Sequence, residues 1–320
     1  MGMNNLHQAL QKNFGFSEFR SPQEEVIKTI LEGRDSLVIM PTGKGKSLCY
    51  QLPAMLQPGV TIVISPLIAL MKDQVDALLR HRIPASYINS SLTPTEQSAE
   101  IDRLRNGLTK IVYIAPERFR NRSFLQAISQ IDVSLMAVDE AHCLSQWGHD
   151  FRPDYLRLDR ALELMGRPTV AALTATATPE VRQDIRNGLR LNNPQAFVAG
   201  FARPNLAFNI RPTNSNEEKF THLIDLIDQK RTGIVYCATR KSVERVSKRL
   251  AEENVDHVTY HGGMDSDTRE QMQEQFISAN TDIAVATNAF GMGIDRPDIR
   301  FVAHFEVPGS VEAYYQEAGR

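Results

Sequence analysis

Cysteine is scarce in this 320-residue chain, which has three, all far apart. An odd number of cysteines without a C-x-x-C pair argues against a disulfide framework and against a zinc site. Long apolar runs are also missing, since none approaches the roughly 18 residues that a membrane span needs. The amino terminus lacks the apolar segment of a secretory signal. We therefore expect a cytosolic chain without a membrane partner.

An excess of positive charge is absent too, because 36 Lys and Arg face 38 Asp and Glu, giving a net charge of -2. Overall charge thus gives no sign of a nucleic-acid partner, although a local basic patch would be enough for one. Hydrophobic residues make up 42% and charged residues 23%, which are values typical of globular proteins. A chain of this length is about right for two domains with a core each.

Short β-branched runs alternate with helical patterns through the first half of the chain. Apolar runs without polar alternation indicate parallel strands that are covered by helices on both faces. The first half therefore predicts an α/β fold with a doubly wound sheet. The five predicted strands are residues 36–40, 60–64, 110–114, 135–138 and 170–173.

The periodicity stops between about residues 201 and 216, where Pro, Asn and Ser collect as they do in linkers. We place the domain boundary within 205–216, with a first domain of residues 1–205 and a second of 206–320. The second half again predicts an α/β domain, with helical patterns between its strands. Its predicted strands are 233–237, 257–260, 281–286 and 301–305, and its predicted helices include 241–253 and 267–276.

A glycine-rich segment, Met40-Pro41-Thr42-Gly43-Lys44-Gly45-Lys46-Ser47, follows the first strand and precedes an apolar helical run. In a phosphate-binding loop, glycines let backbone N–H groups face phosphate, the lysine (Lys46) reaches the terminal phosphates and the serine (Ser47) holds Mg²⁺. The match to G-x-x-x-x-G-K-[ST] is partial, because Met40 replaces the first glycine. On this motif alone, a plain Gly/Lys turn before a helix remains an alternative.

Two adjacent carboxylates, Asp139 and Glu140, end the predicted strand 135–138. In hydrolysis of a nucleotide, Asp139 would hold the metal and Glu140 would orient or deprotonate the attacking water. A solvated acidic turn is the alternative, but the phosphate loop and the second α/β domain disfavour it. The loop that follows, called the aromatic-rich loop below, contains the only tryptophan, Trp147, together with Phe151 and Arg152. These residue types suit stacking against bases.

The segment Asp139-Glu140-Ala141-His142, with Thr174-Ala175-Thr176 after the next strand, resembles the superfamily 2 helicases. The continuation Cys143-Leu144-Ser145-Gln146-Trp147-Gly148-His149-Asp150-Phe151-Arg152-Pro153 resembles the RecQ family of DNA helicases, and the similarity extends over nearly the whole chain. This resemblance implies two RecA-like domains, each a mostly parallel sheet covered by helices, with ATP bound in the cleft between them. It implies ATP and Mg²⁺ as cofactors.

The same resemblance implies ATP-driven 3′-to-5′ movement on single-stranded DNA and unwinding of duplexes in DNA repair and recombination. We expect a monomer, associated with the nucleoid if the source is bacterial. Alternatives are a module that binds nucleotide and nucleic acid without turnover, an RNA helicase and a small-molecule kinase. The second domain disfavours the kinase, and the aromatic-rich loop disfavours the RNA helicase.

Residue roles in the first domain follow from the resemblance as well. The segment 14–23 would bind adenine, with Gln23 pairing with the base edge and Phe16 and Arg20 sandwiching the ring; read alone, it is an ordinary aromatic turn. Ser65 would contact DNA phosphate, although a Ser-Pro helix start explains its segment equally well. Trp147, Phe151 and Arg152 would sense single-stranded DNA, and His142 would relay its presence to the ATP site.

In the second domain, the resemblance implies DNA contacts by Thr239, Arg240, His261, Gly262 and Thr287, and ATP contacts by Gly293, Asp295, Gln316 and Arg320. The last five residues resemble the beginning of an arginine-finger motif, Q-x-x-G-R-x-x-R. The finger itself would lie beyond residue 320. We therefore expect an incomplete second domain and impaired ATP turnover.

Overall fold

The computed structural model describes residues 3–147, 150–200, 203, 205–290 and 296–320. The chain divides into two compact units, Met1–Phe201 and Ala202–Arg320. This division lies just before the segment 205–216, in which the sequence predicts the boundary. None of the helices in the described part of the chain is long and apolar enough to cross a membrane.

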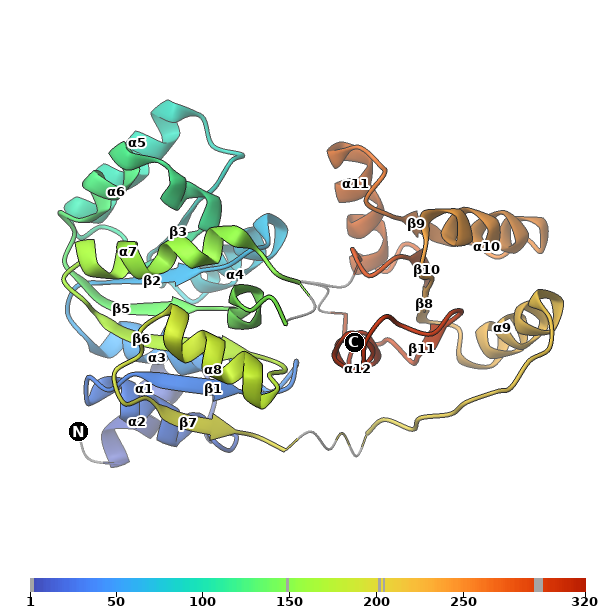
Figure 1. Cartoon of the computed structure of the whole chain (residues 1–320), viewed down its shortest axis with the longest axis horizontal. Helices are drawn as coiled ribbons and strands as arrows, with labels where there is room; N and C mark the ends of the chain where they lie inside the picture. The colour runs from blue at the N-terminus through green and yellow to red at the C-terminus, as the bar shows by residue number, and fades with distance from the viewer. Residues whose placement is uncertain (1–2, 148–149, 201–202, 204, 291–295) are drawn as a thin grey trace. The chain divides into compact units, whose positions relative to one another are not determined.

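The first unit is built on a seven-stranded sheet with the order β3-β4-β2-β5-β6-β1-β7, and all neighbouring strands are parallel (Figure 1). Every apolar run that predicted a strand in this half forms one. The two further strands, β3 and β7, are the two edges of the sheet. The strands are β1 (Ser36–Ile39), β2 (Val60–Ile64), β3 (Ala85–Ile88), β4 (Ile111–Ile114), β5 (Val133–Val138), β6 (Thr169–Thr174) and β7 (Gln195–Val198).

Helices cover both faces of this sheet, as continuous apolar strands require. Alternate residues of β1 point to opposite faces, so Val38 joins one apolar core and Leu37 and Ile39 join the other. The Val38 core contains side chains from α1 (Met3–Phe14), α2 (Gln23–Leu31), α3 (Leu48–Leu56) and α4 (Ile68–Arg80). The opposite core contains side chains from α5 (Pro94–Arg105), α6 (Arg122–Ile128), α7 (Leu158–Leu164) and α8 (Pro179–Gly188). Three short 3₁₀ helices complete the unit: η1 (Pro116–Arg120), η2 (Ala141–Leu144) and η3 (Pro153–Arg157).

The second unit has a four-stranded parallel sheet with the order β11-β8-β10-β9. All four predicted strands form, which confirms the expected α/β build. The strands are β8 (Gly233–Tyr236), β9 (Val258–Tyr260), β10 (Ile283–Ala286) and β11 (Phe301–His304). The helices are α9 (Asn216–Lys230), α10 (Arg240–Glu252), α11 (Ser266–Ile277) and α12 (Val311–Ala318). Two apolar clusters lie on the two faces of the sheet, one with α9 and α10 and the other with α11.

The start of β8 depends on a residue without a side chain. Gly233 pairs with Phe301 of β11, and a Cβ at Gly233 would lie 2.4 Å from the Phe301 ring. We therefore expect Gly233→Ala to lower the free energy of unfolding by about 1 to 3 kcal/mol, the usual cost of overpacking. Urea denaturation measures the change.

Gly309→Ala is the matched control, because no atom lies within 4 Å of a Cβ added at Gly309. We expect the control to change the free energy of unfolding by less than about 1 kcal/mol. Equal stability of the two variants would show that the Phe301 ring yields without cost and that the contact does not constrain the sheet.

Candidate nucleotide and nucleic-acid site

The carboxyl ends of four strands in the first unit lie along one edge of the sheet. Ile39, the last residue of β1, pairs with Thr174 of β6, and Ile64, the last residue of β2, pairs with Val138 at the end of β5. Because the strands are parallel, the segments after them all leave the sheet at this edge, which is the usual ligand side of such sheets. The structure thus gathers the phosphate loop, Ser65, the acid pair and the Thr174–Thr176 segment.

The phosphate loop lies between β1 and α3, as the motif requires. Gly43 and Gly45 each have φ of +77°, in the left-handed region that glycine adopts at little cost. The Lys46 Nζ atom donates a hydrogen bond to the Met40 carbonyl oxygen at 3.1 Å, so the lysine side chain folds back to the start of the loop. Ser47 precedes α3, and its side chain does not cap the helix. In this motif the hydroxyl of the serine is the group expected to hold Mg²⁺.

The segment that was predicted to bind adenine is attached to this loop. Gln23 is 3% exposed, and its Nε2 atom donates to the carbonyl oxygens of Lys44 at 3.3 Å and Gly45 at 3.0 Å. Its Oε1 atom accepts from the Arg20 backbone N–H at 2.8 Å, and the Arg20 guanidinium donates to the Gly43 carbonyl at 3.0 Å. Both ends of the Gln23 amide are therefore engaged, and pairing with adenine requires that Gln23 exchange these bonds.

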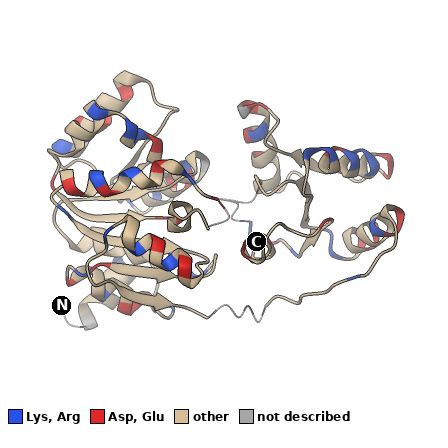
Figure 2. Ribbon diagram, viewed as in Figure 1, with Lys and Arg blue, Asp and Glu red and all other residues tan. Residues whose placement is uncertain are grey.

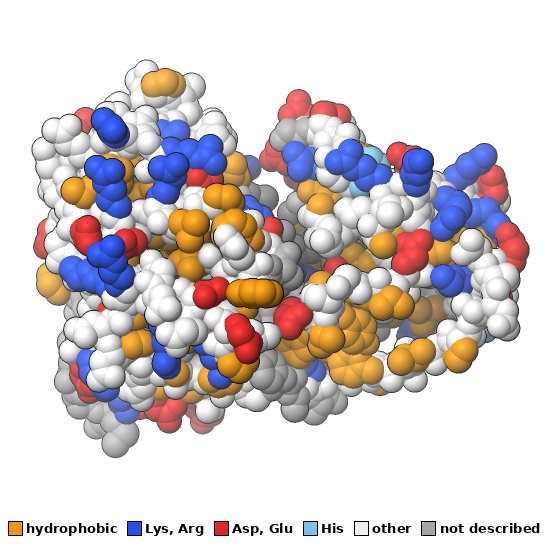
Figure 3. Space-filling model, in the orientation of Figure 1, with side chains coloured by type: hydrophobic (Ala, Val, Ile, Leu, Met, Phe, Trp, Pro, Cys, Tyr) orange, Lys and Arg blue, Asp and Glu red, His pale blue; other side chains and the backbone are white. Residues whose placement is uncertain are grey.

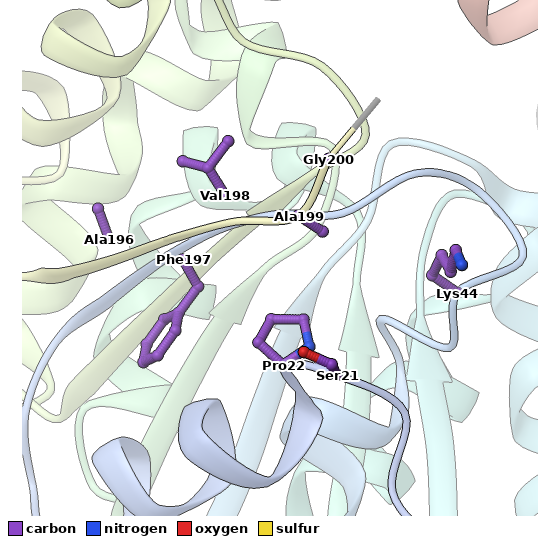
Figure 4. A pocket seen from close by; sticks show the side chains of 8 residues that line it. All are labelled: Ser21, Pro22, Lys44, Ala196, Phe197, Val198, Ala199 and Gly200. Atoms are coloured by element: carbon purple, nitrogen blue, oxygen red, sulfur yellow. The ribbon is translucent and has the colours of Figure 1, made fainter. Parts of the chain in front are cut away.

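A cavity of about 430 Å³ lies beside this contact. Figure 4 shows that the turn before α2, the phosphate loop and strand β7 border it. Phe16, the other predicted adenine contact, is 56% exposed and so remains accessible to a ligand. The residues that line the cavity are Ser21, Pro22, Lys44, Ala196, Phe197, Val198, Ala199 and Gly200.

The acid pair lies at the end of β5, in an environment that disfavours charge. Burial and, to a smaller extent, the neighbouring Glu140 carboxylate raise the pKa of Asp139 to about 6, against the opposing effect of Lys46. Glu140 has φ of +48°, a strained conformation for a residue with a side chain. A cation between Ser47 and Asp139 would stabilise the ionised Asp139 carboxylate, so the residues fit Mg²⁺.

No cluster of three or more His, Cys, Asp or Glu residues that could hold a metal ion exists within the described ranges. Magnesium bound at the phosphate loop would therefore rely on one carboxylate and one hydroxyl, with nucleotide phosphates and water completing its shell. This is the usual arrangement for Mg²⁺ in phosphoryl-transfer sites.

His142 joins the acid pair to the segment after β6. Its side chain is 2% exposed, and its Nδ1 atom lies 2.9 Å from Thr174 Oγ1 and 3.3 Å from Glu140 Oε2. Thr174 Oγ1 donates in turn to the Thr176 carbonyl oxygen at 3.0 Å. The Asp139 carbonyl oxygen accepts a hydrogen bond from the buried Tyr155 hydroxyl at 3.0 Å. These bonds fix the acid pair from both sides.

The aromatic-rich loop presents its tryptophan to solvent. Trp147 is 80% exposed and is therefore not part of either apolar core. Its backbone N–H donates to Ser145 Oγ at 3.1 Å, and Ser145 donates to Asp184 of α8 at 2.6 Å. Phe151 is half-buried, and residues 148–149 lie outside the described ranges. The loop is thus held at its base while the indole ring is accessible.

Arg152 has a structural contact in addition to its predicted DNA contact. Its guanidinium donates to Asp150 Oδ2 at 2.9 and 3.1 Å and to the Pro66 carbonyl oxygen at 3.0 Å. It therefore binds the aromatic-rich loop to the segment after β2. Sequence reasoning missed this role, because a bond from an arginine to a distant carbonyl leaves no pattern in the sequence.

Ser65 directly continues β2 and is 2% exposed. Its hydroxyl oxygen is buried without a hydrogen-bond partner in the described part of the chain. A contact with a DNA phosphate would require the neighbouring segments to move, and the DNA role of Ser65 stays a prediction.

In the second unit, four of the predicted DNA-contacting residues lie close together. Thr239 accepts from the Ser242 backbone N–H at 3.1 Å and so caps α10, which begins at Arg240. A Cβ at Gly263 would lie 2.7 Å from the Arg240 guanidinium, so this side chain lies against the turn containing His261 and Gly262. Both Arg240 and Gly262 are exposed.

The other predicted contacts in this unit are less accessible or undescribed. Thr287 and Gln316 are each 8% exposed. Arg320 follows α12 and is half-buried. Gly293 and Asp295 lie outside the described residues. Among the predicted contacts of this unit that the structure describes, the exposed ones gather around Thr239, Arg240 and the His261 turn.

Helix α10 carries a basic face that sequence reasoning did not single out, although the run Arg240 to Arg249 shows it (Figures 2 and 3). Arg245 pairs with Glu306 at 3.4 Å and Arg249 with Glu217 at 2.7 Å. The other basic residues of the helix are Arg240, Lys241 and Lys248. This is the kind of local basic patch that a chain with a net charge of -2 would need in order to bind nucleic acid.

The environment of Asp139 gives a prediction about stability. Folding raises the pKa of this carboxyl to about 6, so its ionisation costs the folded state more than the unfolded chain. Stability is therefore lost as the pH rises from about 4 to about 6, and at about pH 7.5 Asp139→Asn should raise the free energy of unfolding by up to about 3 kcal/mol. Urea denaturation across this range, without Mg²⁺ or nucleotide, measures it.

Asp76→Asn, at an exposed position of α4, is the control and should leave stability unchanged to within about 0.5 kcal/mol. The gain from Asp139→Asn should vanish below about pH 4, where both states are protonated. A gain that is the same at all pH values would show that packing, and not the charge of Asp139, is responsible.

Comparison with known proteins identifies the family of the chain. The family model described as DEAD/DEAH box helicase matches residues 20–185, and the model described as helicase conserved C-terminal domain matches residues 218–320. The chain is 47% identical to the ATP-dependent DNA helicase RecQ of Pasteurella multocida over 96% of this chain and 48% of that protein. The RecQ protein of Bacillus subtilis is likewise 47% identical, over 98% of this chain and 54% of its own length.

Solved structures share the fold at low sequence identity. The Mycobacterium smegmatis helicase Lhr bound to ssDNA and AMP-PNP superposes with a TM-score of 0.73 at 22% identity, covering 96% of this chain and 44% of that one. The helicase MrfA bound to DNA gives a TM-score of 0.77 at 18% identity, covering 100% of this chain and 49% of that one. The chain spans about half the length of the curated relatives described above. It belongs to the DEAD/DEAH box helicase family and, by its sequence, to the RecQ proteins.

Proposed function

We propose that this chain is the motor core of an ATP-dependent DNA helicase of RecQ type, which moves 3′-to-5′ on single-stranded DNA and unwinds duplexes. The proposal rests on the position of His142. Its side chain contacts both Glu140 of the acid pair and Thr174, and it lies five residues before the exposed Trp147. The relatives named as ATP-dependent DNA helicases support DNA as the partner.

In the nucleotide site, each residue has a distinct role. Lys46 exchanges the Met40 carbonyl for the terminal phosphates, and the backbone N–H groups of the loop hold the remaining phosphate oxygens. Ser47 and Asp139 would hold Mg²⁺, which would supply positive charge to neutralise the phosphates. Glu140 orients the attacking water, and His142 holds Glu140 against Thr174. The pair is therefore fixed before the substrate arrives, which lowers the cost of reorganisation during the reaction.

For nucleic acid, each unit has its own proposed contacts: in the first unit Trp147 stacks on a base, and in the second unit Arg240 and the basic face of α10 contact phosphates. Stacking tolerates any base, and phosphate contacts carry no sequence information. We therefore infer little sequence preference and an affinity that falls steeply with salt. The proposal includes Mg²⁺ as the metal, a monomer as the active form and a location in the cytoplasm, at the nucleoid in a bacterium.

The nucleotide roles are tested by two substitutions that separate binding from chemistry. Lys46→Ala should weaken binding of a fluorescent ATP analogue by more than about tenfold, because a charge-assisted contact to phosphate is lost. Glu140→Gln should keep binding and lose at least about a hundredfold in DNA-stimulated hydrolysis, measured as phosphate release.

Lys28→Ala, on the exposed side of α2, is the control for both assays. Hydrolysis that persists in Glu140→Gln would refute the role in water activation. Binding that persists in Lys46→Ala would remove the phosphate loop from the proposed site.

The DNA role of the aromatic-rich loop is tested with Trp147→Ala. Losing one stacked base should weaken binding of labelled single-stranded DNA by about 5- to 100-fold, measured by fluorescence anisotropy, and lower the DNA stimulation of ATP hydrolysis. Leu156→Ala removes another exposed apolar side chain, which is 53% exposed in η3, and serves as the control.

RNA of the same sequence is the competitor in this assay. Tighter binding of RNA than of DNA would favour an RNA helicase. If Trp147→Ala binds DNA with the same affinity as the unsubstituted chain, the proposed base contact is refuted.

A further inference from the structure

A chain of buried polar side chains runs beneath the phosphate loop, on the α3 and α4 side of the sheet. Tyr50 and Gln51 belong to the first turn of α3, Tyr113 to β4, and Gln74 to α4. The two tyrosine hydroxyls lie 3.4 Å apart. The Gln51 Nε2 atom donates to the Tyr113 hydroxyl at 3.3 Å and to Gln74 Oε1 at 3.2 Å. The contacts form one continuous path.

This path is polar where its surroundings are apolar. Tyr50 is 1% exposed and Tyr113 is 2% exposed, and both belong to the same apolar core as Val63, Met71 and Leu135. A hydroxyl in such a core costs free energy unless it is paired, so each of these bonds constrains the others. Phenylalanine would fill the same space without the constraint. The hydroxyls therefore need an explanation other than packing.

One end of the path reaches the metal-binding groups. Burial raises the pKa of Tyr50 well above its usual value, the neighbouring Tyr113 and the charge of Asp139 raise it further, and a hydrogen bond with the Ser47 side chain opposes this. Burial also raises the pKa of Tyr113 to about 12, with Asp139 among the groups that act on it. Tyr50 lies one helical turn after Ser47, and its backbone N–H donates to the Ser47 carbonyl oxygen at 3.2 Å.

The other end reaches the segment that joins the aromatic-rich loop. Gln74 lies in α4, whose first residue, Ile68, follows Pro66 closely in the chain. The Pro66 carbonyl oxygen accepts the hydrogen bond from Arg152. A shift of α4 along its axis would therefore move the attachment point of the loop that carries Trp147. The path begins at the metal site and ends at the DNA side of the same unit.

We propose that Tyr50, Tyr113, Gln51 and Gln74 are positioning residues that couple metal and nucleotide binding at Ser47 to the start of α4. The coupling follows from the shared Tyr113 oxygen, which Tyr50 contacts at 3.4 Å and to which Gln51 donates at 3.3 Å. Nucleotide and metal binding at Ser47 would displace the first turn of α3, which carries Tyr50. The displacement would pass through the Tyr113 oxygen to Gln51 and from there to Gln74 on α4. The route is separate from His142, and it rests on the proposed function.

The test measures thermodynamic linkage with Tyr113→Phe. The affinity for labelled single-stranded DNA is measured by anisotropy with and without Mg²⁺ and a non-hydrolysable ATP analogue, and the ratio of the two affinities is the coupling. We expect the unsubstituted chain to show a ratio of at least about fivefold and Tyr113→Phe to reduce it by about threefold or more. Because a ratio cancels changes common to both states, a purely structural defect leaves it unaltered.

Tyr87→Phe is the matched control. Tyr87 packs against the same core from the neighbouring strand β3, and no side-chain hydrogen bond joins its hydroxyl to another described residue. The control should keep the full ratio. Tyr50→Phe and Gln74→Met, at the two ends of the path, should reduce the ratio in the same direction, and they provide the test if Tyr113→Phe does not fold.

The outcomes separate the two proposals. If the unsubstituted chain binds neither nucleotide nor DNA, the proposed function fails. If it binds both and Tyr113→Phe, Tyr50→Phe and Gln74→Met all keep the full ratio, the coupling path is refuted while the proposed function stands. A ratio close to one in the unsubstituted chain also refutes the path, because there is then no coupling to carry.

Discussion

The alignment of parallel strand ends is the constraint on which the first unit depends. Residues separated by more than a hundred positions in the sequence become neighbours only because β1, β2, β5 and β6 end at one edge of a sheet. Apolar cores on both faces hold the strands in this register. Without either core, the phosphate loop, the acid pair and the Thr174 segment would no longer lie close together.

The site at this edge is locally unfavourable, and the surrounding fold sustains it. Asp139 is ionised at a cost, Glu140 has a left-handed backbone, and the Ser65 hydroxyl is buried without a partner among the described residues. Unfavourable features such as a buried charge or a left-handed backbone are expected at functional sites, where the surrounding rigid structure offsets their cost. Here the neighbours are His142, Thr174 and Tyr155, whose bonds hold the acid pair between two strands.

The sequence predicts the central strands well, because a strand with neighbours on both sides has a continuous apolar run. The two strands that it missed, β3 and β7, are the edges of the sheet, and three of the four residues of β7 are exposed. A strand with only one neighbour can lack a continuous apolar run, as β7 does, and periodicity then misses it. The edges of the second sheet, β9 and β11, are more apolar and were predicted. The motifs likewise predicted which segments form the site, because their spacing follows the strands.

Side-chain partnerships could not be predicted in this way. Gln23 bonded to the phosphate loop, Arg152 bonded to Pro66 and the buried tyrosine pair all arise from tertiary contacts between segments distant in sequence. The burial of Ser65 has the same origin, since it depends on neighbouring strands. Chemistry at a position can be read from the residue type, whereas accessibility requires the fold.

The central claim is that the acid pair and the aromatic-rich loop act as one unit, and the single tryptophan allows a direct measurement. Because Trp147 is the only tryptophan in the chain and is 80% exposed, its fluorescence reports on this loop alone. Single-stranded DNA should quench the fluorescence, and Mg²⁺ with a non-hydrolysable ATP analogue should shift the midpoint of that titration by about fivefold or more. Quenching with an unchanged midpoint would contradict the account.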